Sequence, residues 1–142
     1  IKMIGAKENP FMYISKADLF VMSSISEGFP NSLVEAMSCG VPVISTDCMT
    51  GPREILYENP DINRKAVKIE YADFGILVPC FDKADSSINE DRYTIMANAI
   101  EEMINNNELR QKYIIKAKER AKQFTIQKSV QGYKECIDSL LK

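Results

Sequence analysis

The stretch SEGFPNSLVEAMSCGVPVISTD, residues 26–47, contains a turn, a helix and a strand in direct succession. Pro30 has a backbone dihedral angle that suits a helix start, and the apolar spacing after it continues to about Ser38. Gly40 fits the C-cap of this helix, because glycine readily adopts the left-handed conformation found there. The segment VPVIST, residues 41–46, is apolar enough for a strand that is buried on both faces of a parallel sheet.

The segments on either side continue this alternation of strands and helices. The apolar run DLFVMSS, residues 18–24, predicts another buried strand, and GILVP, residues 75–79, predicts a third. Short helices are expected within residues 9–17 and 50–56, each with a proline near its start. The segment IKMIG, residues 1–5, is expected to be a further strand. The alternation predicts an α/β fold with a doubly wound parallel sheet.

The C-terminal part of the chain is predicted to be helical, after a loop at residues 57–73 that lacks apolar periodicity. Apolar residues recur at helical spacing in three segments, which asparagines 105–107 and the expected N-cap Thr125 separate. We interpret these stripes, with their Met and Tyr side chains, as core and not as a cofactor site. Their members are Tyr93, Met96, Ala97, Ile100, Met103 and Ile104, then Leu109, Tyr113, Ala117 and Ala121, then Ile126, Val130, Tyr133, Ile137, Leu140 and Leu141.

The composition is that of one globular domain, residues 1–142, with 45% hydrophobic and 27% charged residues. The net charge of −2 argues against nucleic acid as a partner. Residues 108–142 hold nine Lys and Arg against four Asp and Glu, a local charge of +5, so residues 1–107 carry −7. We interpret the basic part as a solvated helix face. The alternative is attraction to an anionic membrane surface or a lipid-linked phosphate.

The four cysteines show no CxxC pair, and the chain has no histidine, so a metal site of the zinc type is not expected. Scattered cysteines of this kind fit a reducing cytoplasm. Cys39 lies near a helix C-terminus, where the helix dipole disfavours a thiolate, and we interpret it as structural. No apolar run approaches the roughly 20 residues of a membrane span.

The turn at residues 27–31 follows a predicted strand directly, and parallel sheets bind ligands beyond the C-terminal ends of their strands. Gly28 allows a close approach of the backbone, and the helix beyond Pro30 offers N–H groups and a positive dipole end to a phosphate. The carboxylates of Glu27 and Glu35 can accept hydrogen bonds from sugar hydroxyls. This combination suits a nucleotide sugar. The plainer alternative is that Glu27 is a loop charge and Glu35 a surface residue of an amphipathic helix.

Paired carboxylates are also typical of glycoside hydrolases, but here both glutamates come from one strand-turn-helix unit with a phosphate-type turn between them. Asp47 and Arg53 flank the next strand-helix junction. We expect Arg53 to form a salt bridge with Asp47 or Glu54 in preference to binding a phosphate. Ser23 and Ser24 are expected to satisfy backbone groups.

The pattern EGFPNSLVE, in which seven residues separate two glutamates, resembles the signature of retaining glycosyltransferases of family 4, in the GT-B fold class. ADLFVMSS before it and AMSCGVPVISTD, GPREIL and YADFGILVP after it are similar to the family too, and QFTIQKSVQGYKECIDSLL resembles its C-terminal helix. The resemblance covers most of the chain except residues 58–65. The segment CMTGPREIL is similar to enzymes that build bacterial capsules, lipopolysaccharide and related surface glycans.

The resemblance implies that the chain is the Rossmann-like C-terminal lobe, which binds the nucleotide-sugar donor. Glu27 would then be the catalytic-site carboxylate and contact the donor-sugar hydroxyls. Glu35 would accept hydrogen bonds from the ribose hydroxyls, and the loop after Gly5 would border the base. The residues lining the sugar and the diphosphate would be Gly28, Phe29, Pro30, Asn31 and Ser32.

The activity implied is transfer of a sugar from a nucleotide-diphosphate sugar, UDP-linked first, to a glycan or lipid-linked acceptor with retained configuration. No metal or other cofactor is expected. The family's acceptor-binding N-terminal lobe and its Arg/Lys pair at the diphosphate have no counterpart here. We therefore expect the chain to be part of a longer enzyme and inactive alone, in the cytoplasm or peripherally bound to the inner face of the membrane.

The first strands of the family's C-terminal lobe also have no counterpart here. Without them the sheet would have an open edge beside residues 18–24, which a dimer or the rest of a longer chain would cover. Two alternative functions remain: a non-catalytic nucleotide-sugar-binding module, and a sugar epimerase of the GT-B type. The intact EGFPNSLVE pattern favours the transferase, because those epimerases have a different acidic pattern.

Overall fold

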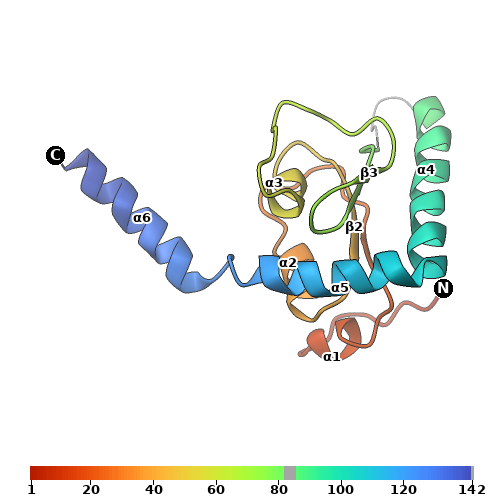
Figure 1. Ribbon diagram of the computed structural model, residues 1–142, viewed down its shortest axis with the longest axis horizontal. Helices are drawn as coiled ribbons and strands as arrows, with labels where there is room; N and C mark the ends of the chain where they lie inside the picture. The colour runs from red at the N-terminus through yellow and green to blue at the C-terminus, as the bar shows by residue number, and fades with distance from the viewer. Residues whose placement is uncertain (82–85, 142) are drawn as a thin grey trace.

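A four-stranded sheet lies at the centre of the computed structural model, which describes residues 1–81 and 86–141 (Figure 1). The strand order is β1-β2-β4-β3, with β1, β2 and β4 parallel to one another and β3 antiparallel to β4. The strands are β1 (Phe20–Met22), β2 (Val43–Thr46), β3 (Glu70–Tyr71) and β4 (Ile76–Val78). The helices are α1 (Phe11–Ile14), α2 (Asn31–Ser38), α3 (Pro52–Leu56), α4 (Ser86–Asn105), α5 (Asn107–Ala121) and α6 (Ile126–Leu140).

The predicted α/β class is confirmed, and helices cover both faces of the sheet. On one face, α2, α3 and the end of α5 pack on the strands through a core that includes Leu33, Ile55 and Ala117. On the other face, α4 and the start of α5 pack through a second core around Met103 and Tyr113. Helix α5 therefore contributes to both cores.

The strand β3 was not expected, since the segment 57–73 shows no strand pattern. It consists of two residues, with Glu70 buried and Tyr71 half exposed, and it makes the sheet mixed. Pairing with β4 stabilises it, together with charged contacts of Glu70 described below. Because strand pairing and charged contacts hold β3, and not an alternating apolar face, the sequence shows no period-two pattern that would predict this strand.

The prediction of a strand at residues 1–5 is wrong. These residues form no strand, and each is exposed. A strand needs a neighbour for its backbone hydrogen bonds, and none of the described strands pairs with this segment. Strand β1 is consequently an edge of the sheet, and its Val21 is 38% exposed where burial on both faces was expected.

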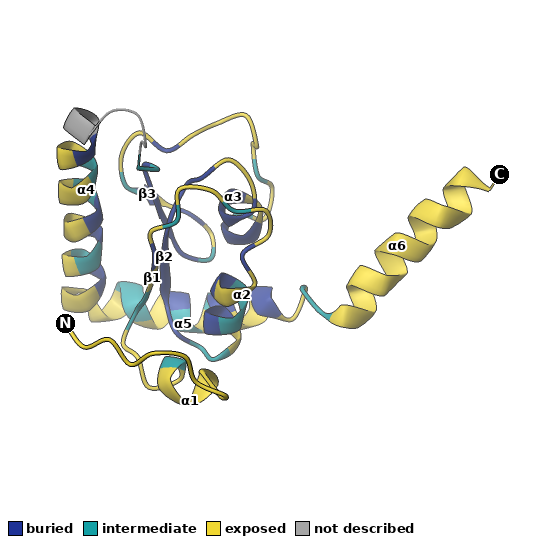
Figure 2. Cartoon of the chain, turned by 180° about the vertical axis from the view of Figure 1, so that it is seen from behind, coloured by how far each residue is buried: buried dark blue, intermediate teal, exposed yellow. Residues whose placement is uncertain are grey.

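The three predicted helical stripes have different outcomes. Tyr113, Ala117 and Ala121 of α5 are buried, as expected. In α4 the prediction is confirmed for Met96 and Met103, which are buried, but Tyr93, Ala97 and Ile104 are exposed and Ala99 is buried instead. Helix α6 has no buried residue, so the interpretation of its stripe as core is wrong. Figures 1 and 2 show why: α6 projects away from the rest of the molecule. Within the described residues, no helix has the length and apolar composition needed to cross a bilayer.

Arg120, near the end of α5, connects this helix to the C-terminal end of α3 by hydrogen bonds. Its guanidinium donates hydrogen bonds to the backbone carbonyls of Glu54, Ile55 and Tyr57 at 2.9–3.0 Å. These carbonyls are at the helix end that carries partial negative charge and lacks intrahelical donors. The side chain is only 7% exposed and lies over the ring of Phe74, with 4.9 Å between Cζ and the ring centroid.

A cluster of buried charges joins β2, α3 and β3. Arg53 in α3 donates to Asp47, which follows β2, at 2.5 Å, and to Glu70 in β3 at 2.9 Å. Asp47 also accepts a hydrogen bond from the backbone N–H of Ala66 at 2.7 Å. The expected salt bridge between Arg53 and Asp47 is confirmed. Glu54, the other expected partner, instead accepts a hydrogen bond from a backbone N–H at the start of α3.

Glu70 makes this cluster sensitive to pH. Burial by itself raises the pKa of its carboxyl group, but the hydrogen bond and charge of Arg53, with Tyr57 and Arg64, outweigh burial and hold the pKa below its usual value. Because the folded pKa is the lower one, the stabilisation is fully present above the unfolded pKa of about 4.3. It is lost as the pH falls through the folded pKa.

We expect Glu70→Gln to lower the free energy of unfolding near neutral pH by about 1–3 kcal/mol, because Arg53 loses a charged hydrogen-bond partner. The difference from the wild type should begin to shrink as the pH falls below the unfolded pKa of about 4.3, and it should disappear below the lowered folded pKa, where the wild-type carboxylate is itself protonated. Urea unfolding over this pH range measures both effects. Glu58→Gln is the control, since Glu58 is exposed and 3.7 Å from Arg120, and it should cost under about 1 kcal/mol. Equal losses in the two variants would contradict this account.

Candidate functional site

Three loops meet at the C-terminal edge of the parallel strands. Residues 23–31 follow β1, residues 47–51 follow β2, and residues 79–81 follow β4. The strands pair in register, Met22 with Ser45 and Thr46 with Val78, so their ends lie side by side. All the residues predicted to bind the donor belong to the first of these loops and to α2, which begins at Asn31.

The loop after β2 holds the 27–31 turn in place. The hydroxyl of Thr50 donates a hydrogen bond to the backbone carbonyl of Glu27 at 2.6 Å. Next to it, Gly51 has φ +92°, and a Cβ on it would lie 2.5 Å from the Gly28 carbonyl oxygen and 2.5 Å from Cδ of Pro30. Position 51 therefore has no room for a side chain, and its backbone is in direct contact with the turn.

The carboxylate of Glu27 is half-buried and is oriented by a neighbour in the same loop. Ser24 donates its hydroxyl hydrogen to Oε1 of Glu27 at 2.6 Å. The carbonyl of Ser24 in turn accepts a hydrogen bond from the hydroxyl of Thr46 at the end of β2. The expectation that the Ser24 hydroxyl satisfies a backbone group is wrong. It fixes the Glu27 side chain, and the spacing of three residues was the available signal.

The start of α2 is accessible. Gly28 is exposed, and a Cβ built on it would meet nothing within 4 Å. The helix begins after buried Pro30 without a side-chain cap, and Asn31 and Ser32 are exposed. The N-terminal amides of a helix carry partial positive charge, so this end of α2 suits an anion such as a phosphate.

Glu35 is in the second turn of α2 and is half-buried. Within the part of the chain that the structure describes, its carboxylate forms neither a hydrogen bond nor an ion pair. Its backbone carbonyl accepts hydrogen bonds from the hydroxyl of Ser38 at 2.7 Å and from the backbone N–H of Cys39 at 3.1 Å. A partly desolvated carboxylate of this kind keeps its acceptor capacity for a ligand. Glu27 and Glu35 thus occupy the two ends of one turn-helix unit, as the sequence predicted.

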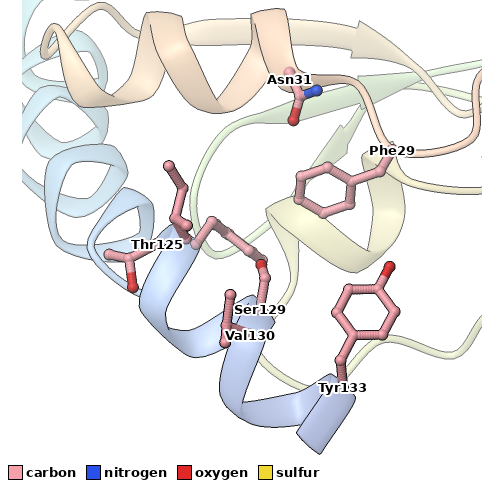
Figure 3. A pocket seen from close by; sticks show the side chains of 8 residues that line it. Phe29, Asn31, Thr125, Ser129, Val130 and Tyr133 are labelled. Atoms are coloured by element: carbon pink, nitrogen blue, oxygen red, sulfur yellow. The ribbon is translucent and has the colours of Figure 1, made fainter.

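The side chain of Phe29 makes a contact that the sequence did not indicate. Its ring packs on Phe124, at the junction of α5 and α6, with 5.4 Å between the centroids and 59° between the planes. Beside this contact, a cavity of about 480 Å³ separates the turn from α6 (Figure 3). Phe29 and Asn31 line it from the turn, and Tyr133 faces Phe29 from α6.

Two cysteines, Cys48 and Cys80, lie near the site and line a common cavity. Burial is the main cause that raises the pKa of the Cys48 thiol to about 11, and the neighbouring Cys80, Glu27 and Asp47 contribute to the same shift. Among residues 1–81 and 86–141, no group of three or more Cys, Asp or Glu side chains could hold a metal ion. Cys39, which we interpreted as structural, is half-buried at the end of α2.

The fold and the arrangement of the turn define the class of the protein: an α/β lobe similar to GT-B glycosyltransferase structures. The family model of the glycosyl transferases group 1 matches residues 1–106. The chain belongs to this family.

Relatives and solved structures agree with this family. The chain is 36% identical to an uncharacterised glycosyltransferase of Methanocaldococcus jannaschii, over 99% of the chain and 36% of that protein. It is 30% identical to the N-acetylgalactosamine-N,N'-diacetylbacillosaminyl-diphospho-undecaprenol 4-alpha-N-acetylgalactosaminyltransferase of Campylobacter jejuni, over 87% of the chain and 28% of that enzyme. The chain therefore spans about a third of the length of these relatives.

Two solved structures share the fold at lower identity. Sucrose-phosphate synthase from Thermosynechococcus elongatus superposes with a TM-score of 0.63 at 22% identity, covering 91% of this chain and 27% of that one. The pneumococcal O-GlcNAc transferase, solved in complex with UDP and GlcNAc, gives 0.64 at 21% identity, covering 94% and 23%.

We expect Gly51→Ala and Gly28→Ala to differ in their effect on stability. Gly51→Ala should lower the free energy of unfolding by more than about 1 kcal/mol, because it combines a positive φ with two close contacts, one to the Gly28 carbonyl oxygen and one to the Pro30 ring. Gly28→Ala is the matched control and should change it by less than about 0.5 kcal/mol, since its Cβ meets open space. Urea denaturation of both variants measures the difference. A Gly51→Ala variant as stable as the wild type would show that the turn does not depend on this contact.

Proposed function

We propose that the protein supplies the donor-binding half of a retaining glycosyltransferase of family 4, which transfers a sugar from a nucleotide-diphosphate sugar, with UDP as the first candidate nucleotide. The observation that supports this most is the 27–31 turn. It combines an oriented carboxylate, an open glycine and an uncapped helix start at the ligand-binding edge of the sheet. A donor of this class needs an anion site beside acceptors for hydroxyl hydrogens, and the turn offers both.

Each end of the unit has a separate role in this proposal. The diphosphate lies at the start of α2, where backbone amides stabilise its charge. Glu35, whose carboxylate has no other partner among the described residues, accepts hydrogen bonds from the ribose hydroxyls. Glu27 contacts the hydroxyls of the donor sugar, and its bond from Ser24 restricts the carboxylate to one orientation. Backbone atoms of residues 28–31 and the side chain of Ser32 line the space between.

Cationic side chains that neutralise the departing diphosphate must complete the site. The described cations nearest the edge are engaged elsewhere: Lys65 donates to the carbonyls of Cys48 and Met49, and Arg92 donates to that of Cys80. We therefore assign this role, with acceptor binding, to parts of the enzyme beyond these 142 residues. In the proposal the reaction uses no metal, and sugar transfer requires those further parts.

The acceptor proposed is a glycan or a lipid-linked precursor of one. The Campylobacter jejuni relative is named for transfer to a diphospho-undecaprenol-linked saccharide. An acceptor of that class would place the reaction at the inner face of the cytoplasmic membrane. Exposed lysines of α5 and its C-cap, among them Lys112 and Lys122, suit peripheral attraction to anionic lipids there.

We expect UDP to protect the amides of residues 28–33 from hydrogen exchange, because its phosphates occupy the start of α2. The measurement is hydrogen exchange with mass spectrometry, with and without UDP, and uridine serves as the control that lacks phosphate. Uridine should leave these amides unprotected. Binding of UDP with protection confined to another segment would contradict the proposed position of the diphosphate.

The two glutamates should separate binding from turnover in the active enzyme that contains this lobe. Glu35→Ala should weaken nucleotide binding by about 1–3 kcal/mol, the contribution of lost charge-assisted hydrogen bonds. Glu27→Ala should mainly lower kcat, because Glu27 contacts the reacting sugar. Glu119→Ala, at an exposed position of α5, is the control and should change neither.

Calorimetry with UDP and initial rates with a UDP-sugar measure these effects, and the anomeric configuration of the first product, read by NMR, tests retention. A Glu27→Ala variant that loses UDP affinity at unchanged kcat would overturn the assigned roles. An inverted product would overturn the retaining mechanism.

A further inference from the structure

The pairing of β2 with β4 brings two cysteines together that are far apart in the sequence. Thr46 is the register partner of Val78 in this parallel pair, and the backbone N–H of Asp47 continues the ladder by donating to the Val78 carbonyl at 2.8 Å. Cys48 and Cys80 each come two residues after the last paired position. They therefore occupy equivalent positions beyond the ends of two adjacent strands.

Both thiols lie on the same side of this edge. Residues 48 and 80 lie just beyond the ends of β2 and β4, where the ladder still continues through the backbone of Asp47. Both cysteines line one cavity of about 400 Å³ at the end of the strands. Their electrostatic proximity also appears in the pKa of Cys48, which Cys80 raises.

The spacing fits a covalent bond between them. Adjacent strands are about 4.8 Å apart, and cystines bridge Cα separations of about 4.4–6.8 Å. We infer that Cys48 and Cys80 form a reversible disulfide when the protein meets an oxidised low-molecular-weight or protein disulfide. The inference does not depend on the proposed function, because it rests on strand register and side-chain position alone.

The reaction is a two-step thiol-disulfide exchange. Cys80, the more accessible of the two, attacks one sulfur of the oxidant as a thiolate; the S–S bond of the oxidant breaks, and the first thiol leaves with the proton that Cys80 gave up. The Cys48 thiolate then attacks the Cys80 sulfur of the mixed disulfide and releases the second thiol. Two electrons pass from the cysteines to the oxidant, which ends as two thiols.

Oxidation would remove two contacts that hold the 27–31 turn. The Cys80 thiol donates to the carbonyl of Ile25 at 3.3 Å, two residues before Glu27. The Cys48 thiol donates to the carbonyl of Thr50 at 3.9 Å, and the Thr50 hydroxyl holds the carbonyl of Glu27. A disulfide has no S–H donor, so both contacts are lost together. The bond is therefore a modification that loosens the turn from two sides.

The test uses oxidised glutathione as the oxidant and peptide mapping by mass spectrometry under non-reducing conditions. The wild-type protein should give a cross-linked Cys48–Cys80 peptide, lose two titratable thiols through this bond, and recover both with dithiothreitol. The rate should rise as the pH increases towards the raised pKa of Cys48, because its thiolate completes the bond. Amides of residues 25–28 should exchange faster in the oxidised protein than in the reduced one.

A background variant in which Cys39 and Cys136 are replaced by serine should cross-link as the wild type does. In that background, Cys48→Ser should stop at a mixed disulfide of Cys80 with glutathione. The inference is overturned if the wild-type protein accumulates the mixed disulfide without the cross-link, or if Cys48 or Cys80 pairs instead with Cys39 or Cys136. It is also overturned if the cross-link forms only in denaturant. None of these readouts involves UDP binding. A negative result would therefore leave the proposed function unaffected, and a failure of UDP binding would leave the disulfide inference unaffected.

Discussion

The parallel register of β1, β2 and β4 is the constraint on which the rest of the structure depends. Parallel strands end at a common edge, so the three loops that follow must share the same space. The strands are short, at three or four residues each, and their ladders alone fix little of what lies beyond them. The conformations of the three loops therefore depend on contacts between side chains and backbone at this edge.

Those contacts differ in chemistry on the two sides of the edge. The 27–31 turn is held by hydroxyl groups and by the backbone of Gly51, which leaves its carboxylate and its helix start open to solvent. The segment that leads to β3 is held by the buried charges of Asp47, Arg53 and Glu70. Removing one partner from such a cluster leaves an uncompensated buried charge, so the loss of any one of these side chains is costly even where the net stabilisation by the cluster is modest.

The sequence predicted the elements that are determined by interactions between residues close together in the chain. The helix after Pro30, its end at Gly40, the strand β2 and the cap at Thr125 follow from dihedral preferences, apolar spacing and a capping side chain. The turn and its two glutamates were predicted for the same reason, since they lie within nine consecutive residues.

The features that sequence reasoning missed depend on contacts between distant segments. Strand β3 exists because of β4 and the charge of Arg53, and the Ser24 hydroxyl faces Glu27 because Thr46 engages the Ser24 carbonyl. The adjacency of Cys48 and Cys80 arises from the register of two strands, β2 and β4, that 29 residues separate. Contacts between such distant segments leave no periodic pattern in the sequence from which they could be predicted. The strand expected at residues 1–5 failed for the converse reason: its pattern is apolar, but nothing among the described residues pairs with it.

Helix α6 shows the limit of periodicity most directly. Its apolar residues recur at helical spacing and Thr125 caps it, yet the face from Ile126 to Leu140 is exposed along its length. Periodicity reports which face a helix is able to bury, whereas burial requires a partner surface. An isolated helix of about 12–15 residues is only marginally stable in water. The contact of Phe29 with Phe124 is thus important at the junction, because it packs the base of α6 against the 27–31 turn. Any surface that covered the apolar face would stabilise α6 and restrict the cavity beside Phe29 at the same time.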